Sequence, residues 1–521
     1  MTKTNTSTIF VASAGTGKTT TLMDLLTDCL EKTTPNRICF TTFTKAGATE
    51  AIDRALVKNE SYAQADFEAF STLHALCYRR IPRKQMLTVQ DYRQIGELTG
   101  YPISGSAAYS SKDGLVYNSN AGDKILYYDS LVRNLKSTPE EVINSQIGAR
   151  VTAEQLADFS AFYKDYKMKK NKYDFTDQLE TYLAQGIIPE FDYVFIDEAQ
   201  DLSPLQWDIV DFISQKAKEV FIAGDDKQSI FKFAGGDPSS LINRQGKRIV
   251  LDTSYRLPQP VLDYAEKVAD QISEKQDYSV KSNKDHGSVQ HIHSLTDLDM
   301  SKGTWFLLCR NKAHMEIFEH ALMKKQQLFV SASSHSLFNQ KQIDFILMWE
   351  QLRRGYKFKA SQLKVLYREF LPSGRVVARG CKNLLDSMPD NELFDKDQLV
   401  DSFGLKTTVK WDLIFKLPEF TKEVLLKAEA EGTLERSADV QINTIHATKG
   451  READNVVVLP DITETTYKGM LKDMDNEHRV FYVAATRARQ NLYVHAPTTN
   501  RFYQMPKWYT KLNHSNTKKT L

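Results

Sequence analysis

The sequence predicts an α/β fold in which short buried strands alternate with helices, and two observations support that expectation. The stretch Val11 to Thr20 reads V-A-S-A-G-T-G-K-T-T and lies between an apolar run, Thr8 to Val11, and a segment with leucines at helical spacing. Further apolar runs of strand length end in small or polar residues, as strands of a parallel sheet do where the sheet presents ligands. Two strand-rich halves, each interrupted by a charged helical stretch, predict two α/β domains with insertions.

Length and composition bound the class of protein. The chain has 521 residues, too many for a single hydrophobic core, and its 41% hydrophobic and 26% charged residues are ordinary for a globular protein. Lys plus Arg (68) nearly balances Asp plus Glu (66), so any nucleic-acid contact would have to come from a local groove. The five cysteines form no C-x-x-C pair, and no apolar run reaches the ~18 residues of a membrane span. We therefore expect a cytoplasmic protein that has no zinc site and does not contact a membrane.

The glycine-rich stretch has the form of a phosphate-binding loop. Backbone N–H groups of Gly15, Thr16 and Gly17 can converge on a polyphosphate at the positive end of the following helix, because glycine lets the chain approach closely. Lys18 would then reach the outer phosphates, and the Thr19 hydroxyl would bind Mg²⁺. The alternative is a glycine-rich turn that holds no ligand.

Two later strand ends carry candidate catalytic groups. The apolar run before Asp197 and Glu198 fits a strand that delivers two adjacent carboxylates, of which Asp197 would hold Mg²⁺ through water and Glu198 would accept a proton from the attacking water. The run Val220 to Ala223 is followed by Gln228, which at such a position can touch the γ-phosphate. Together with the phosphate loop, these residues predict a nucleotide hydrolase.

Several residues are ambiguous between a structural role and a nucleic-acid contact. Phe43 follows the predicted strand Arg37 to Thr42 and either stacks on a base or belongs to the core. His74 on its own is more often a structural histidine. Phe231 and Phe233 face a bound strand or pack internally, and the five lysines between Lys164 and Lys172 form either a solvated face or a nucleic-acid contact.

The alternation of strand-rich and helical stretches divides the chain into five parts. We expect a first α/β domain over 1–84 plus 172–250 with a helical insertion over 85–171, a second α/β domain over 251–352 plus 433–510 with a short insertion over 353–432, and a flexible tail over 511–521.

In this order, the segments resemble the motif series of the UvrD/Rep/PcrA-type superfamily-one DNA helicases. The resemblance spans Ala12 to Arg487, and Asp174 to Leu179 is similar to the family's D-F-x-D-L-L segment. The six motif segments are Ala12–Thr19, Asp197–Asp201, Gly224–Phe231, Ser254–Arg256, Thr444–Glu452 and Tyr482–Ala488.

The resemblance implies two RecA-like P-loop NTPase domains with parallel sheets and with ATP and Mg²⁺ between them. Tyr255 would stack on adenine, and Arg256 and Arg487, the latter late in a helix over Glu477 to Arg489, would act as arginine fingers. The implied catalytic residues are Lys18, Asp197, Glu198, Gln228, Arg256 and Arg487, with Thr19 and Asp197 on the metal. The implied nucleotide-binding residues are Ala14, Gly15, Thr16, Gly17, Lys18, Thr19, Thr20, Tyr255, Arg256, Glu452 and Arg487.

The resemblance also implies single-stranded DNA and single-strand/duplex junctions as partners, with movement from 3′ to 5′. The implied DNA contacts are Phe43, Thr72, His74, Phe233, Thr444 and His446. Two other hypotheses stay open: a helicase-like, DNA-stimulated ATPase subunit or sensor of a defence or nuclease complex, and an RNA helicase. A nuclease or a repair or replication factor is the kind of protein partner expected.

The sequence departs from the family pattern in places. Ala234 stands where an arginine is expected, and Phe231 and Phe233 replace a tyrosine and a tryptophan. The second insertion, Arg353 to Gly432, is about half the usual length, so the contacts with duplex DNA assigned to it are expected to be reduced.

Overall fold

The computed structural model describes residues 6–58, 61–104, 120–333, 338 and 340–507. The tail predicted over 511–521 lies outside the described residues. The chain forms two compact units. The first comprises Met1–His291, Ile445–Glu452 and Pro460–Leu521, and the second comprises Ile292–Thr444 and Ala453–Leu459.

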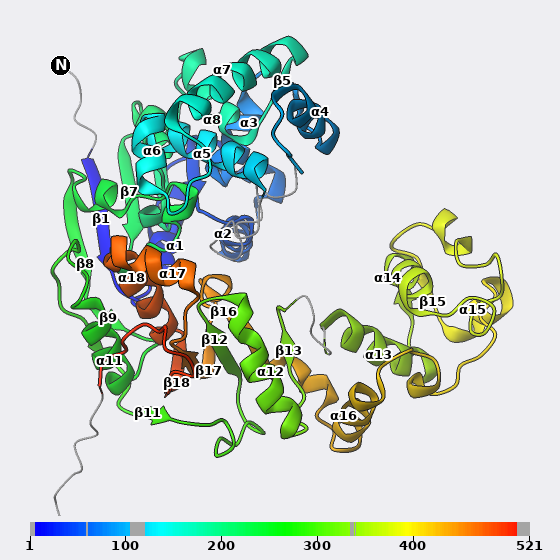
Figure 1. Ribbon diagram of the computed structural model, residues 1–521. Coiled ribbons are helices and arrows are strands. Elements are labelled where there is room, and N and C mark those ends of the chain that lie inside the picture. Colours follow the sequence, from blue (N-terminus) through cyan, green and yellow to red (C-terminus); the bar gives the residue numbers. More distant parts are fainter. Residues whose placement is uncertain (1–5, 59–60, 105–119, 334–337, 339, 508–521) are drawn as a thin grey trace, which may run out of the picture. The chain divides into compact units, whose positions relative to one another are not determined.

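The first unit is built on a six-stranded sheet in which every pairing is parallel, so all strands end at the same edge. Figure 1 shows β1, β7 and β8 side by side. The loops that follow β1, β6 and β7 hold the predicted phosphate loop, the paired carboxylates and the glutamine. In spatial order the strands are β3 (Phe70–Ser71), β2 (Ile38–Thr41), β6 (Tyr193–Ile196), β7 (Glu219–Gly224), β1 (Thr6–Ala12) and β8 (Lys247–Leu251).

Both faces of this sheet are buried, each by its own hydrophobic cluster. Along β1, Ile9 and Val11 point into one cluster and Phe10 into the other, as the period of two requires. This double burial explains why the strands read as continuous apolar runs. The helices of the first unit outside its insertion are α1 (Lys18–Leu30), α2 (Lys45–Lys58), α3 (Leu73–Arg80), α8 (Phe175–Gln185), α9 (Pro204–Ser214), α10 (Pro238–Ile242), α11 (Gln259–Ala269), α17 (Glu464–Lys472) and α18 (Met474–Ala485).

The stretch between β4 and β5 is helical, with a hydrophobic cluster of its own. Its helices are α4 (Val89–Thr99), α5 (Ala121–Leu135), α6 (Pro139–Ser145) and α7 (Ala153–Lys170), and the short parallel pair β4 (Gln85–Met86) and β5 (Lys172–Tyr173) closes it. Figure 1 shows these helices gathered around α8 in blue to cyan.

The lysine run over Lys164 to Lys172 is partly internal. Lys167 is 5% exposed, and its ammonium lies 2.6 Å from a carboxylate oxygen of Asp174. Lys172 pairs with Asp91 at 2.7 Å. These two lysines therefore stabilise the insertion, and only the remaining ones are left for the nucleic-acid contact considered above.

The second unit contains four strands linked by parallel pairs: β12 (Trp305–Cys309), β13 (Val330–Ser331), β16 (Val440–Thr444) and β17 (Ala453–Leu459). In spatial order these four strands are β17, β12, β16 and β13. Two further strands in the chain's second half are β11 (Ser288–Ile292) and β18 (Ala488–His495). The helices of the second unit are α12 (Met315–Lys324), α13 (Gln340–Arg353), α14 (Ala360–Val365), α15 (Lys396–Ser402) and α16 (Glu419–Ala430).

Two short strand pairs complete the description. Strands β14 (Phe358–Lys359) and β15 (Leu393–Phe394) are antiparallel, and β9 (Thr253–Ser254) pairs with β10 (Lys281–Ser282). The predicted α/β class with two parallel sheets and helical insertions is confirmed.

The predicted helix over Glu477 to Arg489 is wrong at its C-terminal end. Helix α18 stops at Ala485, because Thr486 leaves helical geometry and caps the helix. Arg487 therefore lies in the turn that follows, and Arg489 lies on β18. This turn brings Arg487 back against the helix it follows.

The state of the cysteines and the hydropathy of the helices bear on zinc binding and membrane contact. All five cysteines lie in the described part of the chain as free thiols, and four of them are buried. Among the helices of the described residues, none combines the length and apolar character needed to cross a membrane.

The insertion offers a test of how much its buried charges stabilise the first unit. Arg133 is 15% exposed and forms ion pairs with Asp174 at 2.7 Å, Asp177 at 2.5 Å and Glu180 at 2.7 Å. Arg133→Met removes one of the two cations of this cluster and leaves only Lys167 beside Asp174 and Asp177, so we expect a loss of about 3–5 kcal/mol in the free energy of unfolding. Urea unfolding followed by circular dichroism measures it.

The matched control is Arg54→Met, which breaks an exposed pair with Glu50 on α2. Exposed pairs contribute little, so this variant should unfold like the parent chain. Equal midpoints for the two variants would contradict a stabilising role for the Arg133 cluster.

Candidate nucleotide site and aromatic nucleic-acid surface

The loop between β1 and α1 has the backbone that a phosphate cradle needs. Gly15 has φ +74° and Gly17 has φ +83°, both in the left-handed region that favours glycine. Space is restricted as well at Gly15, where a Cβ atom would collide with the Cβ of Arg256 and lie 3.0 Å from the Ser254 hydroxyl oxygen. The chain is therefore closely approached at Gly15 by the Ser254–Arg256 segment, and the approach of a polyphosphate stays a prediction.

That segment is docked on the loop through its backbone and one hydroxyl. The Tyr255 N–H donates to the Gly15 carbonyl at 2.8 Å, and the Ser254 hydroxyl donates to the Ala14 carbonyl at 2.9 Å. Tyr255 is 59% exposed, so it is accessible to a ligand. Two motifs predicted separately from the sequence thus form one surface.

The other loop residues divide into fixed and open groups. The Thr16 hydroxyl donates to the Ser13 carbonyl at 3.0 Å, and the Lys18 ammonium donates to the same carbonyl at 3.3 Å. Thr20 is exposed at the start of α1. Lys18 is therefore held at the loop by one neutral acceptor, which a phosphate oxygen can replace.

Thr19 and Asp197 meet across the loop, as the sequence predicts for a metal site. The Thr19 hydroxyl donates to Asp197 Oδ2 at 2.9 Å. Burial, together with the adjacent Glu198 carboxylate, raises the pKa of Asp197 to about 6. A hydroxyl beside a buried carboxylate is a donor set that suits Mg²⁺, which takes its other ligands from phosphates and water. No cluster of three His, Cys, Asp or Glu side chains with metal-binding geometry occurs among the described residues.

Glu198 is held in an unusual backbone conformation. Its φ of +55° and ψ of +40° are left-handed, which costs a non-glycine residue about 1–3 kcal/mol and is a feature of functional sites. Its carboxylate accepts from the Gln200 amide at 2.5 Å. Burial disfavours the charged form, but Lys18 and Lys449 oppose it and hold the pKa of Glu198 below its ordinary value. The carboxylate is therefore ionised and oriented.

Gln228 and Arg487 meet although they are 259 residues apart. Gln228 ends the single 3₁₀ turn Asp226–Gln228 and accepts from Arg487 Nη2 at 2.8 Å. Arg487 is 1% exposed, and burial together with the positive Arg256 lowers its pKa to about 9. The guanidinium remains charged at neutral pH, so a buried cation stands beside the predicted γ-phosphate sensor.

Glu452 joins two arginines. It forms an ion pair with Arg256, and its second carboxylate oxygen lies 3.0 Å from Arg489 Nε. The sequence predicts Glu452 and Arg256 at the nucleotide, whereas Arg489 was missed. Arg489 lies near the start of β18, a place for which the sequence gave no signal.

Lys449 is the most important residue that sequence reasoning missed. Its ammonium pairs with Asp201, donates to the Gln228 carbonyl at 2.7 Å and lies 4.9 Å from the Phe231 ring centre. The only available signal was its place in the T-x-H-x-x-K-G-x-E segment. Burial raises the pKa of Asp201 to about 7 against the opposing effect of Lys449.

Aromatic side chains cluster beside this site. The Phe43 and Phe231 rings stack with centres 4.9 Å apart and 16° between their planes. Phe233 lies edge-on to Phe231 at 5.8 Å and to His446 at 5.9 Å. Phe43, Phe231 and Phe233 are only half-buried, so the structure brings two of the predicted DNA contacts, Phe43 and Phe233, together with Phe231.

The other predicted DNA contacts are placed differently. The Thr72 hydroxyl caps α3 by accepting from the Ala75 N–H at 3.3 Å. His74 lies edge-on to Phe175 at 6.3 Å, and burial lowers its pKa to about 4, so it is neutral at physiological pH. Thr444 ends β16 in the second unit and is 1% exposed. Residue roles at these positions stay predictions.

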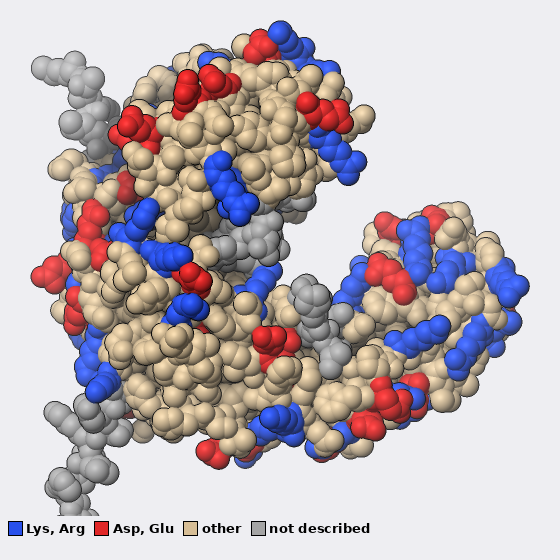
Figure 2. All heavy atoms as spheres, in the orientation of Figure 1, with Lys and Arg blue, Asp and Glu red and all other residues tan. Residues whose placement is uncertain are grey.

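Surface charge does not single out one region. On the face drawn in Figure 2, the described Lys and Arg side chains are interspersed with Asp and Glu, as the net charge of +2 leads one to expect. Any attraction for a polyanion must therefore come from local groups such as Lys18, Arg256 and Arg487.

Comparison with known families finds one match in each half of the chain. Residues 1–248 match the UvrD/REP helicase N-terminal domain. Residues 391–498 match the UvrD-like helicase C-terminal domain.

Curated relatives match across most of the chain. The "ATP-dependent DNA helicase PcrA" of Staphylococcus epidermidis is 21% identical over 95% of this chain and 82% of its own length. The protein of the same name from Staphylococcus aureus is 22% identical over 96% and 82%. A "Probable DNA helicase II homolog" of Mycoplasma capricolum is 27% identical over 49% of this chain and 37% of its own length.

Gly15 provides a test of the close approach in the loop. Gly15→Ala would force a Cβ atom into Arg256 and strain a left-handed residue, so we expect binding of a fluorescent ATP analogue to weaken by at least about 100-fold. The binding titration measures this loss directly.

Gly100→Ala is the matched control. Gly100 has the same φ of +74°, but a Cβ atom there would meet nothing within 4 Å. It should retain nucleotide affinity, and a comparable loss in both variants would mean that strain alone, without the approach of Arg256, explains the effect.

Proposed function

This chain belongs to the UvrD/REP helicase family, and from that premise we propose that it is an ATP-dependent DNA helicase that moves 3′ to 5′ along single-stranded DNA. The observation that carries the proposal is the Gln228–Arg487 contact beside the phosphate loop and the paired carboxylates. A phosphate loop alone is common to many nucleotide-binding proteins. A glutamine and a buried arginine from distant motifs are what a motor needs to sense the γ-phosphate.

ATP is proposed to lie with its phosphates against the loop Gly15 to Thr19. Lys18 would exchange its bond to the Ser13 carbonyl for a phosphate oxygen, and Tyr255 would cover the base. Mg²⁺ would be held by Thr19 and Asp197 and would neutralise part of the phosphate charge when bound. The oriented Glu198 carboxylate would accept the proton of the attacking water.

Charge on the transferred phosphate would be stabilised by the cations around it. Arg487 is already buried and charged, so it needs no reorganisation when negative charge develops. Arg256 is paired with Glu452 and would have to turn towards the phosphate. Gln228, which accepts from Arg487, would orient the water or the γ-phosphate.

The link to DNA is proposed to run through Lys449. This lysine touches the Gln228 carbonyl on one side and the Phe231 ring on the other. A change at Gln228 on hydrolysis would therefore reach the stacked Phe43 and Phe231 rings. Bases stacking there would be bound with little sequence preference, because every base presents an aromatic face.

The assignment of the remaining DNA contacts and of the domains is part of the same proposal. Thr72, His74, Phe233, Thr444 and His446 are proposed to line the strand's path. The proposed domains are the two RecA-like cores with their insertions at 85–171 and 353–432. Partners are single-stranded DNA, single-strand/duplex junctions, and a nuclease or a repair or replication factor.

Lys18 tests the hydrolytic part of the proposal. Lys18→Ala removes the cation expected on the outer phosphates, so DNA-stimulated ATP hydrolysis should fall by at least about 100-fold. Phosphate release with and without single-stranded DNA measures it. Lys58→Ala, which breaks an exposed pair with Asp24, is the control and should hydrolyse ATP like the parent chain. Undiminished turnover in Lys18→Ala would exclude the proposed site.

The polarity is tested with duplexes that carry a single-stranded tail on either side. The parent chain should separate a 3′-tailed duplex in an ATP-dependent manner and leave a 5′-tailed duplex of the same sequence paired. A strand-displacement assay measures both. Preference for the 5′ tail would reverse the proposed direction, and hydrolysis without displacement would mean that the chain is a DNA-stimulated ATPase that does not unwind alone.

A further inference from the structure

We infer that Lys227, Glu266 and Tyr278 form a positioning cluster behind the nucleotide site, which fixes Gln228 relative to the phosphate loop and to Arg256. The inference rests on the proposed function, because it assigns to these residues an effect on ATP turnover. None of the three is among the residues predicted to touch the nucleotide. Their effect would be exerted through the backbone elements that they join.

Lys227 is almost completely buried for a charged residue. Its side chain is 2% exposed, and its ammonium lies 2.7 Å from Glu266 Oε2 and 4.4 Å from the centre of the Tyr278 ring. Burying an ammonium group costs several kcal/mol unless a partner compensates for the lost water. The carboxylate and the ring face supply that compensation, so Lys227 is held in one place.

Tyr278 joins this pair to the phosphate loop. Its hydroxyl donates to the carbonyl of Ala12 at 2.9 Å and lies 3.5 Å from Asp225 Oδ1. Ala12 is the last residue of β1, directly before the loop. The hydroxyl of Tyr278 therefore contacts the residue directly before the phosphate loop, and the face of its ring contacts the Lys227 ammonium.

Glu266 joins the pair to the element that carries Arg256. It lies on α11, which begins at Gln259, three residues after Arg256. The ion pair thus connects the Gln228 turn with the helix that follows the proposed arginine finger. Three elements meet in one buried cluster: the end of β1 directly before the phosphate loop, the turn after β7 and the C-terminal half of α11.

The turn that carries Gln228 needs such anchors because it is short. A single 3₁₀ turn, Asp226–Gln228, has too few internal hydrogen bonds to hold its own direction. The Asp226 carboxylate accepts from the backbone N–H of Gln276 at 3.0 Å and from its side chain at 3.1 Å. With Asp226 and Lys227 both held from outside, the direction in which Gln228 points towards Arg487 is determined.

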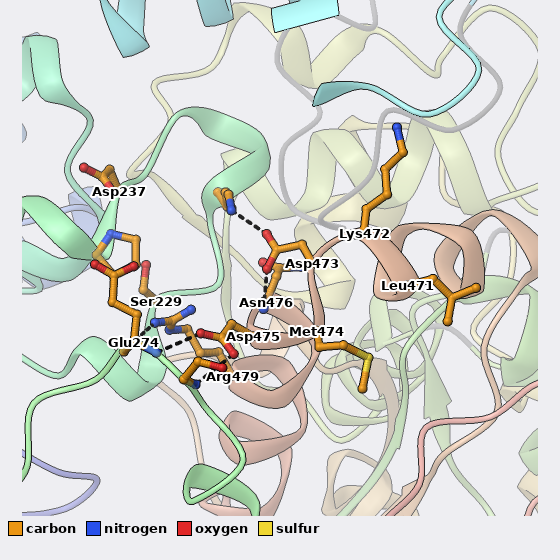
Figure 3. A pocket seen from close by; sticks show the side chains of 13 residues that line it. Ser229, Asp237, Glu274, Leu471, Lys472, Asp473, Met474, Asp475, Asn476 and Arg479 are labelled. Atoms are coloured by element: carbon orange, nitrogen blue, oxygen red, sulfur yellow. Dashed lines mark hydrogen bonds and ion pairs between the residues drawn. The ribbon is translucent and has the colours of Figure 1, made fainter. Parts of the chain in front are cut away.

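The segment that supplies Gln276 and Tyr278 is itself held in place beside a pocket of about 410 Å³. Figure 3 shows Asp475, Arg479 and Glu274 at this point. Asp475 accepts from the N–H groups of Ser273 and Glu274 at 2.9 and 3.0 Å. Arg479 donates to the Glu274 carbonyl at 2.5 Å and to the Asp226 carbonyl at 3.0 Å. The cluster therefore rests on a fixed support.

The experiment separates positioning from stability with single and double variants of the full chain. Lys227→Met removes the ammonium, Glu266→Gln removes its charge partner, and Tyr278→Phe removes only the hydroxyl that reaches Ala12. Lys227→Arg keeps the charge. DNA-stimulated kcat, affinity for a fluorescent ATP analogue and the midpoint of urea unfolding are measured for each.

The expected result for Lys227→Met is a kcat lower by roughly 10- to 100-fold, with nucleotide affinity within about twofold of the parent, because small displacements of a catalytic group reduce turnover more than binding. Lys227→Arg should recover most of the lost turnover. Tyr278→Phe should give a smaller loss of kcat than Lys227→Met, because its ring still faces Lys227.

The double variant Lys227→Met, Glu266→Gln discriminates between the two roles. Removing both charges avoids an unpaired buried ion, so its unfolding midpoint should return towards that of the parent chain. If the pair positions Gln228, kcat stays low in this stable double variant. Recovery of kcat together with stability would overturn the inference, as would a normal kcat in Lys227→Met.

Two further measurements keep the outcomes distinct. Arg133→Met breaks a buried ion cluster in the insertion of the same unit and should lower the unfolding midpoint without lowering kcat below the transition. If the parent chain shows no DNA-stimulated hydrolysis, the proposed function fails. If the parent chain is active and Lys227→Met is equally active, only the positioning role fails.

Discussion

The buried guanidinium of Arg487 is the group on which the arrangement of the site depends. Its Nε donates to the Val483 carbonyl at 2.9 Å, and Nη1 and Nη2 reach the Arg451 carbonyl and the Gln228 amide at 3.3 and 2.8 Å. A cation taken out of water must be met by acceptors on all sides, so the turn after α18 and the turn after β7 are obliged to converge. The pKa of Arg487 is lowered by burial and by the neighbouring Arg256. An anion bound beside these two cations would therefore be stabilised by both of them.

The buried carboxylates near this cation are likewise compensated by neighbouring groups of opposite charge. Asp201 is fully buried and raised in pKa by that burial, and Lys449 compensates it while also touching Gln228. Glu198 has a left-handed backbone conformation. Its carboxyl group has a lowered pKa because Lys18 and Lys449 are near. The site therefore holds its charges close to balance before any ligand binds, and a polyphosphate with its metal would enter by displacing weak neutral contacts such as that of Lys18 with the Ser13 carbonyl.

How far the sequence predicts this site depends on the range of each interaction. The loop after β1 and the carboxylates after β6 follow from local patterns, because strands of one parallel sheet end at a common edge wherever they lie in the chain. The ion-pair partners of Lys227 and Lys449 could not be predicted from the sequence, because nothing in a polar segment indicates that its lysine will be buried. The helix predicted to extend to Arg489 was wrong for a similar reason: no glycine or proline marks its end at Ala485, and the long-range contacts of Arg487 with Arg451 and Gln228 have no local signal.

The distribution of these contacts along the chain has a consequence for folding. The first unit gathers Met1–His291 with two late segments, Ile445–Glu452 and Pro460–Leu521. Those late segments supply Lys449 to Asp201, and Tyr482 to the Ser13 hydroxyl at 2.7 Å. Without them, the early residues would bury a carboxylate that lacks its cation, which costs more than the exposed alternative. The nucleotide site is thus completed only when the end of the chain has returned to its beginning, which couples assembly of the catalytic groups to folding of the whole first unit.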